Sequence, residues 1–123
     1  MSVNVVVTSI PADVNSSAFL TAQQNIYGAV DVSAFDILDL ECVVDVVTGG
    51  IGPITIDLWT GWDLSSYNVW YKAGTFGSFS AAGNSSLRLN AGFQRYIAWA
   101  ASFSSSVGSC KFDIRGIGES YAR

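Results

Sequence analysis

The side chains of this chain that are best suited to binding chemistry are aromatic and lie close together in the sequence. Residues 56–72, IDLWTGWDLSSYNVWYK, hold three of the four tryptophans and two of the five tyrosines. Large aromatic rings stack on the apolar faces of ligands and act as anchors in protein interfaces. The candidate contact residues are Trp59, Trp62, Asp63, Tyr67 and Trp70.

Three roles are open to this aromatic stretch. Its rings can pack within the domain itself, form the centre of a protein interface, or stack on a sugar ring whose hydroxyls bond Asp63 or Asn68. We expect Trp62 to contact another protein, because it falls in a predicted loop, where burial within its own domain is hardest.

Catalytic groups are scarce in the sequence. The chain has no histidine, which is the commonest general base and the commonest metal ligand. Cys42 and Cys110 are too far apart for a zinc motif, and TGGIGP (residues 48–53) lacks the Lys-Ser/Thr of a phosphate-binding loop. We therefore predict no catalytic residue, no metal site and no cofactor, and we expect the protein not to be an enzyme.

The charge is low and unevenly distributed. Charged residues make up 13% of the chain, against roughly 25% in an ordinary domain. This low fraction indicates either that part of the surface is covered by other chains or that the domain is a compact sandwich with a surface of Ser, Thr and Asn. Residues 1–71 carry eight acids and no base, and residues 72–123 carry six bases and two acids, so the net charges are −8 and +4. With a total of −4 and no basic cluster, we expect no binding to nucleic acid.

Membrane insertion and secretion are not indicated. No apolar run reaches the 18 or more residues that a spanning helix needs, and the start MSVNVVVTSIP lacks a basic segment before a long apolar one. We expect synthesis in a reducing cytoplasm, with Cys42 and Cys110 remaining thiols.

A period of two dominates the sequence and predicts strands. In FDILDLECVVDVV (residues 35–47) apolar residues from Leu38 onward alternate with Asp39, Glu41 and Asp45, which we expect to be solvated or paired with arginines of a neighbouring chain. In the next strand Trp59 is out of phase with Leu58 and points away from the core. The residues predicted for the core are Leu38, Leu40, Cys42, Val44, Ile54, Ile56, Leu58, Cys110, Phe112 and Ile114.

The fold class that follows is all-β, an antiparallel β-sandwich of jelly-roll type with seven to eight strands. Residues 1–17 are predicted to form an N-terminal strand or arm, with its strand ending at Pro11, and residues 18–123 a single β-sandwich domain. Residues 15–28 are expected to be extended or irregular, and SFSAAGNSS (residues 78–86) is expected to be a loop.

Several of these segments, taken in order, resemble small β-proteins of tailed bacteriophage virions. The resemblance rests on the opening VDVSAF (residues 30–35), on Trp70, on RYI (residues 95–97) and on FDIRGIG (residues 112–118). It covers about residues 30 to 118. The chain departs from the family pattern S-x-D-G-G-x-x-W, because it has GWDLSSYNVW (residues 61–70) in that place.

The resemblance implies a non-enzymatic structural protein that binds the outer capsid surface and cements or decorates the shell. Its expected partners are the major capsid protein and further copies of itself, as a homotrimer, on a virion made in the host cytoplasm. The alternative is a carbohydrate- or receptor-binding β-sandwich of a phage tail or head fibre. A cement protein should present flat apolar patches and form a symmetric oligomer. A sugar binder should present a concave row of aromatic rings with Asp63 or Asn68 beside it, and should bind glycans as an isolated protein.

Overall fold

The computed structural model of the chain describes residues 5–15, 21–23, 29–48, 54–64, 70–103 and 109–120, with side chains for 29–45, 54–64, 70–102 and 110–120. These residues form strands, turns and bends. Within them there is no helix long and apolar enough to cross a membrane.

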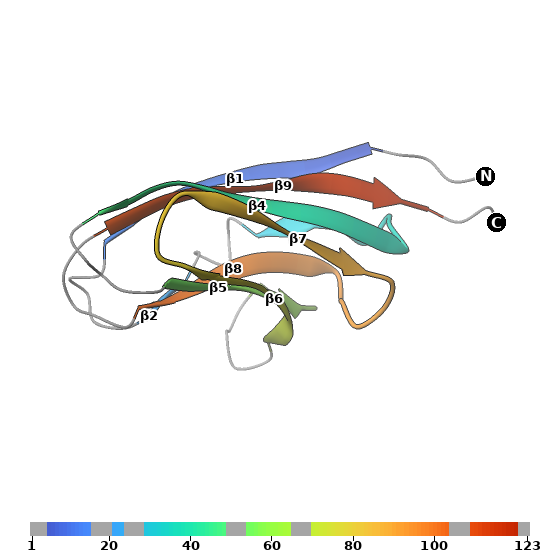
Figure 1. Cartoon of the computed structure of the whole chain (residues 1–123). Coiled ribbons are helices and arrows are strands. Elements are labelled where there is room, and N and C mark those ends of the chain that lie inside the picture. The colour runs from blue at the N-terminus through green and yellow to red at the C-terminus, as the bar shows by residue number, and fades with distance from the viewer. Residues whose placement is uncertain are drawn as a thin grey trace.

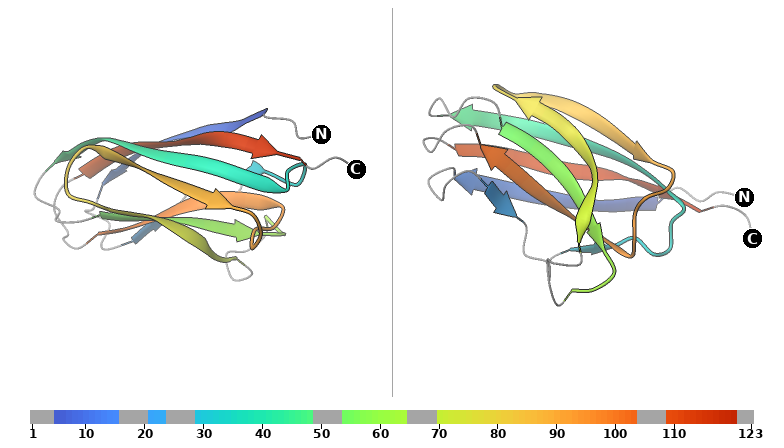
Figure 2. Two further views of the ribbon diagram at one scale, coloured as in Figure 1. Left: turned by 45° about the vertical axis from the view of Figure 1, so that its right-hand side comes forward. Right: turned by 90° about the horizontal axis from the view of Figure 1, so that it is seen from below.

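Two antiparallel sheets pack face to face (Figure 1). The first sheet has the order β1 (Val5–Asn15), β9 (Ser109–Glu119), β4 (Ile37–Thr48), β7 (Gly83–Leu89). The second sheet has the order β2 (Thr21–Gln23), β8 (Tyr96–Phe103), β5 (Ile54–Gly61), β6 (Tyr71–Phe79), and β3 (Val30–Asp31) also pairs with β8. Figure 2 shows the two layers from two further directions.

The predicted all-β antiparallel sandwich is confirmed. Among the described residues, seven strands have seven or more residues, and β2 and β3 are shorter additions. The chain passes repeatedly between the layers, since β1, β4, β7 and β9 belong to the first sheet and β2, β5, β6 and β8 to the second. This alternation is compatible with a jelly roll, which remains a prediction.

The core lies between the two inner faces, where the period of two places it. All ten residues predicted for the core are buried, and none is more than 2% exposed. Across the layers, the rings of Trp99 and Phe112 meet edge to face with their centroids 5.1 Å apart. The inward and outward residues of these strands can therefore be assigned from sequence alternation alone.

Two predictions about strand ends are wrong. Strand β1 does not end at Pro11 but continues to Asn15, with Pro11 opposite Asp113. Since β1 is at the edge of its sheet, a residue without an N–H fits there. The predicted loop at 78–86 is also too long, because β6 extends to Phe79 and β7 begins at Gly83. The small polar residues of β7 are typical of loops, but here they form an exposed edge strand.

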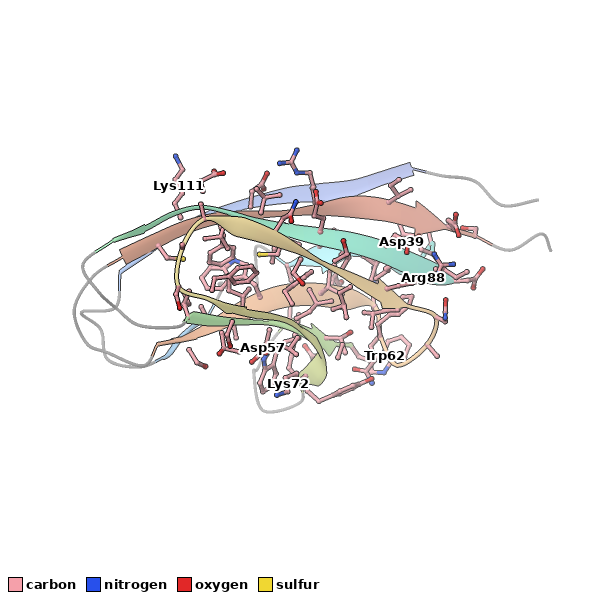
Figure 3. All side chains as sticks on the ribbon, in the orientation of Figure 1. Asp39, Asp57, Trp62, Lys72, Arg88 and Lys111 are labelled. Atoms are coloured by element: carbon pink, nitrogen blue, oxygen red, sulfur yellow. The ribbon has the colours of Figure 1, made fainter. Side chains whose placement is uncertain are left out.

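The charged halves of the sequence interleave in the first sheet. Asp39 of β4 lies opposite Arg88 of β7, and both of its carboxylate oxygens accept hydrogen bonds from the Arg88 guanidinium at 2.7 Å (Figure 3). Glu41 lies opposite Arg115 of β9 in the register of the sheet. Asp39 and Glu41 therefore lie opposite basic residues of their own chain, where the sequence had suggested solvent or a neighbouring chain, whereas Asp45 is exposed.

Substitution of Leu40 tests the packing of the core. Leu40 is buried opposite Leu87 and Gly116, so Leu40→Ala should lower the free energy of unfolding by about 2–5 kcal/mol through the cavity it leaves. The neighbouring Asp39→Ala should cost at most about 1 kcal/mol, because the ion pair of Asp39 with Arg88 is exposed. Urea denaturation of both variants measures the difference, and equal losses would contradict this core.

A second test uses the buried thiol of Cys42. Burial raises its pKa from 9.0 to about 12, with smaller contributions from Cys110, Asp113 and Glu41. Because the folded pKa lies above the unfolded one, this thiol's contribution to stability is complete below about pH 9 and is lost as the pH rises toward 12. The slope is at most about 1.4 kcal/mol per pH unit.

We expect the unfolding free energy of the wild type to fall more steeply above pH 9 than that of Cys42→Ala. Urea titrations at several pH values between 8 and 11 measure both slopes. Parallel curves for the two proteins would show that the Cys42 thiol is not held neutral by the fold.

Candidate functional site

The structure separates the predicted contact residues. Trp70 is buried and Trp59 is partly buried, whereas Trp62 is 65% exposed and Asp63 is also exposed. Tyr67 lies outside the described residues. Within the described part of the chain, Trp62 is therefore the tryptophan that presents its ring to solvent.

Trp70 and Trp59 belong to a second apolar cluster outside the main core. Trp70 and Ala98 are buried in it, with Trp59 and Leu64 packed against them. Since Trp59 lies opposite Ala98 while its neighbour Leu58 is in the main core, the prediction that Trp59 points away from the core is confirmed. Packing within the domain, one of the three roles considered for the aromatic stretch, is the role of Trp70.

The Trp70 ring fixes the chain on both sides of Trp62. It packs flat against Gly61, where an added Cβ would lie 2.5 Å from ring atoms. Its indole Nε1 donates a hydrogen bond to the carbonyl oxygen of Asp63 at 2.7 Å. The even-numbered residues of β5, from Ile54 to Thr60, face the core. Trp62 is the next even-numbered residue, but it lies beyond Gly61, the last residue of the strand. Its side chain therefore emerges at the end of the sandwich (Figure 3).

Trp62 borders a hollow of about 220 Å³ that three loops form together. The loop after β3 contributes Val32, Ser33 and Phe35, and the loop before β8 contributes Phe93, Gln94 and Arg95. Val32 is fully buried, and Phe35 and Phe93 are partly buried against the core. The hollow is thus a concave site with aromatic walls and polar groups, which is the composition typical of small-ligand sites.

A buried hydroxyl positions Gln94. The Thr60 side chain is fully buried, and its Oγ1 donates to the Tyr96 carbonyl at 2.8 Å and accepts from the Gln94 backbone N–H at 2.7 Å. Three buried polar side-chain atoms of the described residues have no hydrogen-bond partner, namely Asp57 Oδ1, Trp59 Nε1 and Gln94 Oε1. Of these residues, Gln94 lines the hollow.

The Gln94 amide oxygen is buried from solvent and has no hydrogen-bond partner, so a ligand in the hollow can reach it only if the amide turns. A buried acceptor without a partner costs about 1–3 kcal/mol, and a donor that reaches it recovers that free energy. The terminal torsion of a glutamine is soft, so the amide can turn toward such a donor without a movement of the backbone. A ligand with a hydroxyl or N–H group beside an apolar face fits this arrangement.

The charged group at the hollow is Arg95, and it is already paired. Its Nε donates to Asp31 Oδ2 at 3.1 Å, and its guanidinium carbon lies 5.1 Å from the centroid of the Tyr96 ring. Asp31 Oδ1 accepts from the Ser33 backbone N–H at 2.9 Å. Hydrogen bonds from Ser33, and then Arg95, hold the pKa of Asp31 below its usual value, so the carboxylate is ionised at neutral pH and balances the arginine.

The floor of the hollow depends on a close contact with the last strand. The Phe35 ring lies over Gly118 of β9, where any Cβ would overlap it. The Phe35 N–H donates to the Val32 carbonyl at 3.1 Å, and the Val32 N–H donates to the Arg95 carbonyl at 2.7 Å. These bonds join the two loops on either side of the hollow, so the site is built on paired backbone.

Sequence reasoning missed most of this site. The sequence points to Trp62 but not to Phe93 or Gln94, and it marks Phe35 and Arg95 only as parts of the VDVSAF and RYI segments. Asn68, the other polar group considered for a sugar site, lies outside the described residues. The available signal was a polar-aromatic run, FQRY (residues 93–96), directly before a strand.

A second hollow, of about 440 Å³, lies on the outer face of the first sheet. It is lined by charged side chains, including Asp39, Arg88 and Arg115, and by Ile117, which is 43% exposed. The two hollows share no lining residue. This face is an apolar centre with a charged rim, which is the usual anatomy of a protein interface.

Comparison with known proteins adds no family assignment, since neither family models nor curated proteins match this chain. Among the described residues, no three metal-ligating side chains lie close enough together to hold an ion. The chemistry that the Trp62 site itself can offer is recognition through ring stacking and hydrogen bonds.

Substitution of Gly61 tests the anchoring of Trp62. In Gly61→Ala the added methyl group meets the Trp70 ring, so we expect a loss of about 1–3 kcal/mol in unfolding free energy and displacement of that ring. Gly83→Ala is the matched control, because its Cβ would meet only an ordinary contact at 3.8 Å. Near-ultraviolet circular dichroism and urea denaturation measure the effect. Equal behaviour of the two variants would rule out the close packing of Gly61 on Trp70.

Proposed function

We propose that this chain is a non-enzymatic recognition protein of a virion and that the hollow beside Trp62 binds a saccharide of a surface receptor. The observation that carries the proposal is that an exposed tryptophan lines a hollow together with the polar residues Gln94 and Arg95. The polar groups expected beside a sugar were Asp63 and Asn68, but Asp63 does not line this hollow and Asn68 lies outside the described residues, so the proposal depends on Gln94 and Arg95 instead.

A saccharide suits the site because of how its polar and apolar groups are arranged. A pyranose ring has an apolar face of C–H groups that stacks on an indole, and its rim carries hydroxyls that both donate and accept. The hollow offers the Trp62 ring, the acceptor of Gln94 and the donors of Arg95. A nucleic acid is disfavoured by the net charge of −4.

Placement on a virion is supported by the resemblance of residues 30–118 to small β-proteins of tailed bacteriophages. The low charged fraction of 13% is a further argument for contacts with other chains. A receptor-binding protein of a particle needs one surface for the particle and another for the receptor. The outer face of the first sheet and the Trp62 hollow are two such separate surfaces.

The second candidate function is capsid cementing or decoration, and the exposed Ile117 favours it. Ile117 stands beside the hollow on the first sheet, near the Arg88–Asp39 ion pair at 2.7 Å and the Arg115–Asp113 pair at 3.8 Å. On this hypothesis the partner is the major capsid protein, and the chain self-associates as a homotrimer.

Two single substitutions separate these functions. Trp62→Ala should leave the thermal midpoint almost unchanged and weaken binding on a glycan array by about 2 kcal/mol, the scale of an anchor residue, while binding to capsids persists. Ile117→Asp should leave glycan binding intact and weaken cosedimentation with capsids.

The opposite pattern would overturn the saccharide proposal. If the wild type binds no glycan and Trp62→Ala abolishes capsid binding, then Trp62 is a protein contact, as the sequence had suggested. If both variants retain capsid binding and glycan binding, neither surface has the function assigned to it.

A further inference from the structure

The charge around the Trp62 hollow bears on which saccharides it accepts, and this argument rests on the proposed function. Arg95 is the charged residue among those that line the hollow, and its Nε is held by Asp31 at 3.1 Å. The carboxylate of Asp31 is oriented by a hydrogen bond from the Ser33 N–H at 2.9 Å. The pair has no net charge, so it gives an anionic sugar little electrostatic attraction.

We infer that the hollow selects a single neutral pyranose over acidic sugars, and that Asp31 determines this selectivity by neutralising Arg95. Arg95 still has donors for sugar hydroxyls, because a guanidinium carries five N–H groups and Asp31 engages the one on Nε. Hydrogen bonds to hydroxyls therefore survive the pairing, whereas attraction to a carboxylate does not. Asp31 is a positioning residue here, since it acts through Arg95.

The size of the hollow limits the ligand to one ring. Its volume is about 220 Å³, below the roughly 300–1,000 Å³ of sites for drug-sized molecules. A ring stacked on Trp62 would lie beside Gln94 and Arg95, so its hydroxyls could accept from Arg95 and, once the Gln94 amide turns outward, donate to its oxygen. Further residues of a polysaccharide would extend past the exposed indole into solvent.

The overall charge of the chain acts in the same direction. The net charge is −4, and the exposed Asp63 is adjacent to Trp62 in the sequence. A carboxylate-bearing sugar would therefore meet a negative background as well as a neutralised arginine. Removal of the Asp31 charge should leave Arg95 uncompensated and so strengthen the binding of acidic sugars at the hollow.

The test uses Asp31→Asn on the full chain. Asparagine retains a side-chain oxygen for the Ser33 N–H but leaves the charge of Arg95 uncompensated. The matched control is Asp45→Asn, which makes the same charge change at an exposed position of β4. Ligand-observed NMR or calorimetry would measure binding of the methyl glycosides of glucose, galactose and mannose, of methyl glucuronide and of N-acetylneuraminic acid.

We expect the wild type and Asp45→Asn to bind at least one neutral glycoside about tenfold or more tightly than either acidic sugar. In Asp31→Asn that ratio should fall by about tenfold, and the acidic sugar bound by this variant should dissociate more readily at high salt. Gln94→Leu should weaken neutral and acidic sugars alike, because it removes the amide without changing the charge.

The outcomes distinguish the selectivity from the function it rests on. If the wild type binds acidic sugars as well as neutral ones, or if Asp31→Asn leaves the ratio unchanged, the selectivity inference is wrong while saccharide binding stands. If the wild type binds none of these sugars and no polysaccharide on an array, the proposed function itself is wrong.

Discussion

The strict alternation of inward and outward side chains is the constraint on which the rest of this structure depends. Two sheets exclude water between them when nearly every second residue of each strand is apolar. Trp62 follows the last residue of β5 in a bend, and there its side chain is 65% exposed. The exposed tryptophan therefore lies where the alternating strand ends.

The buried hydroxyl of Thr60 links the core to the loop that lines the Trp62 hollow. Thr60 occupies an inward position of β5, where an apolar residue would pack equally well but would leave the Gln94 N–H and the Tyr96 carbonyl without that partner. Its two hydrogen bonds join β5 to the residues just before and within β8. The loop that carries Gln94 is consequently held by the core, and the hollow does not depend on the loop's own packing.

The sequence predicts the features that follow from the two-residue repeat of the strands. It does not predict those that depend on which distant segments of the chain come together. The core residues of β4, β5 and β9 follow from alternation, and so does the outward direction of Trp59. The extent of β7 does not, because its serines and asparagine are compatible with a loop and with an exposed edge strand alike. The pairing of Asp39 with Arg88 requires the register of two strands that are far apart in the sequence.

The hollow beside Trp62 is the least predictable element for a physical reason. Phe35, Trp62 and Gln94 belong to three different loops. The sequence around each residue contains no pattern that predicts contact between these loops. Their meeting depends on hydrogen bonds between distant backbone groups, such as that from the Val32 N–H to the Arg95 carbonyl. A single conspicuous tryptophan could be found from the sequence, but its surroundings required the fold.

The position of β9 has a consequence for how the protein is made. This strand follows the other described strands, yet in the first sheet it lies between β1 and β4 and pairs with both. Until the ribosome has synthesised residues 109–119, β1 has no neighbour in that sheet. One edge of β1 and one edge of β4 therefore stay unpaired until β9 is available, so this sheet closes through contacts between residues far apart in the sequence, which fold slowly.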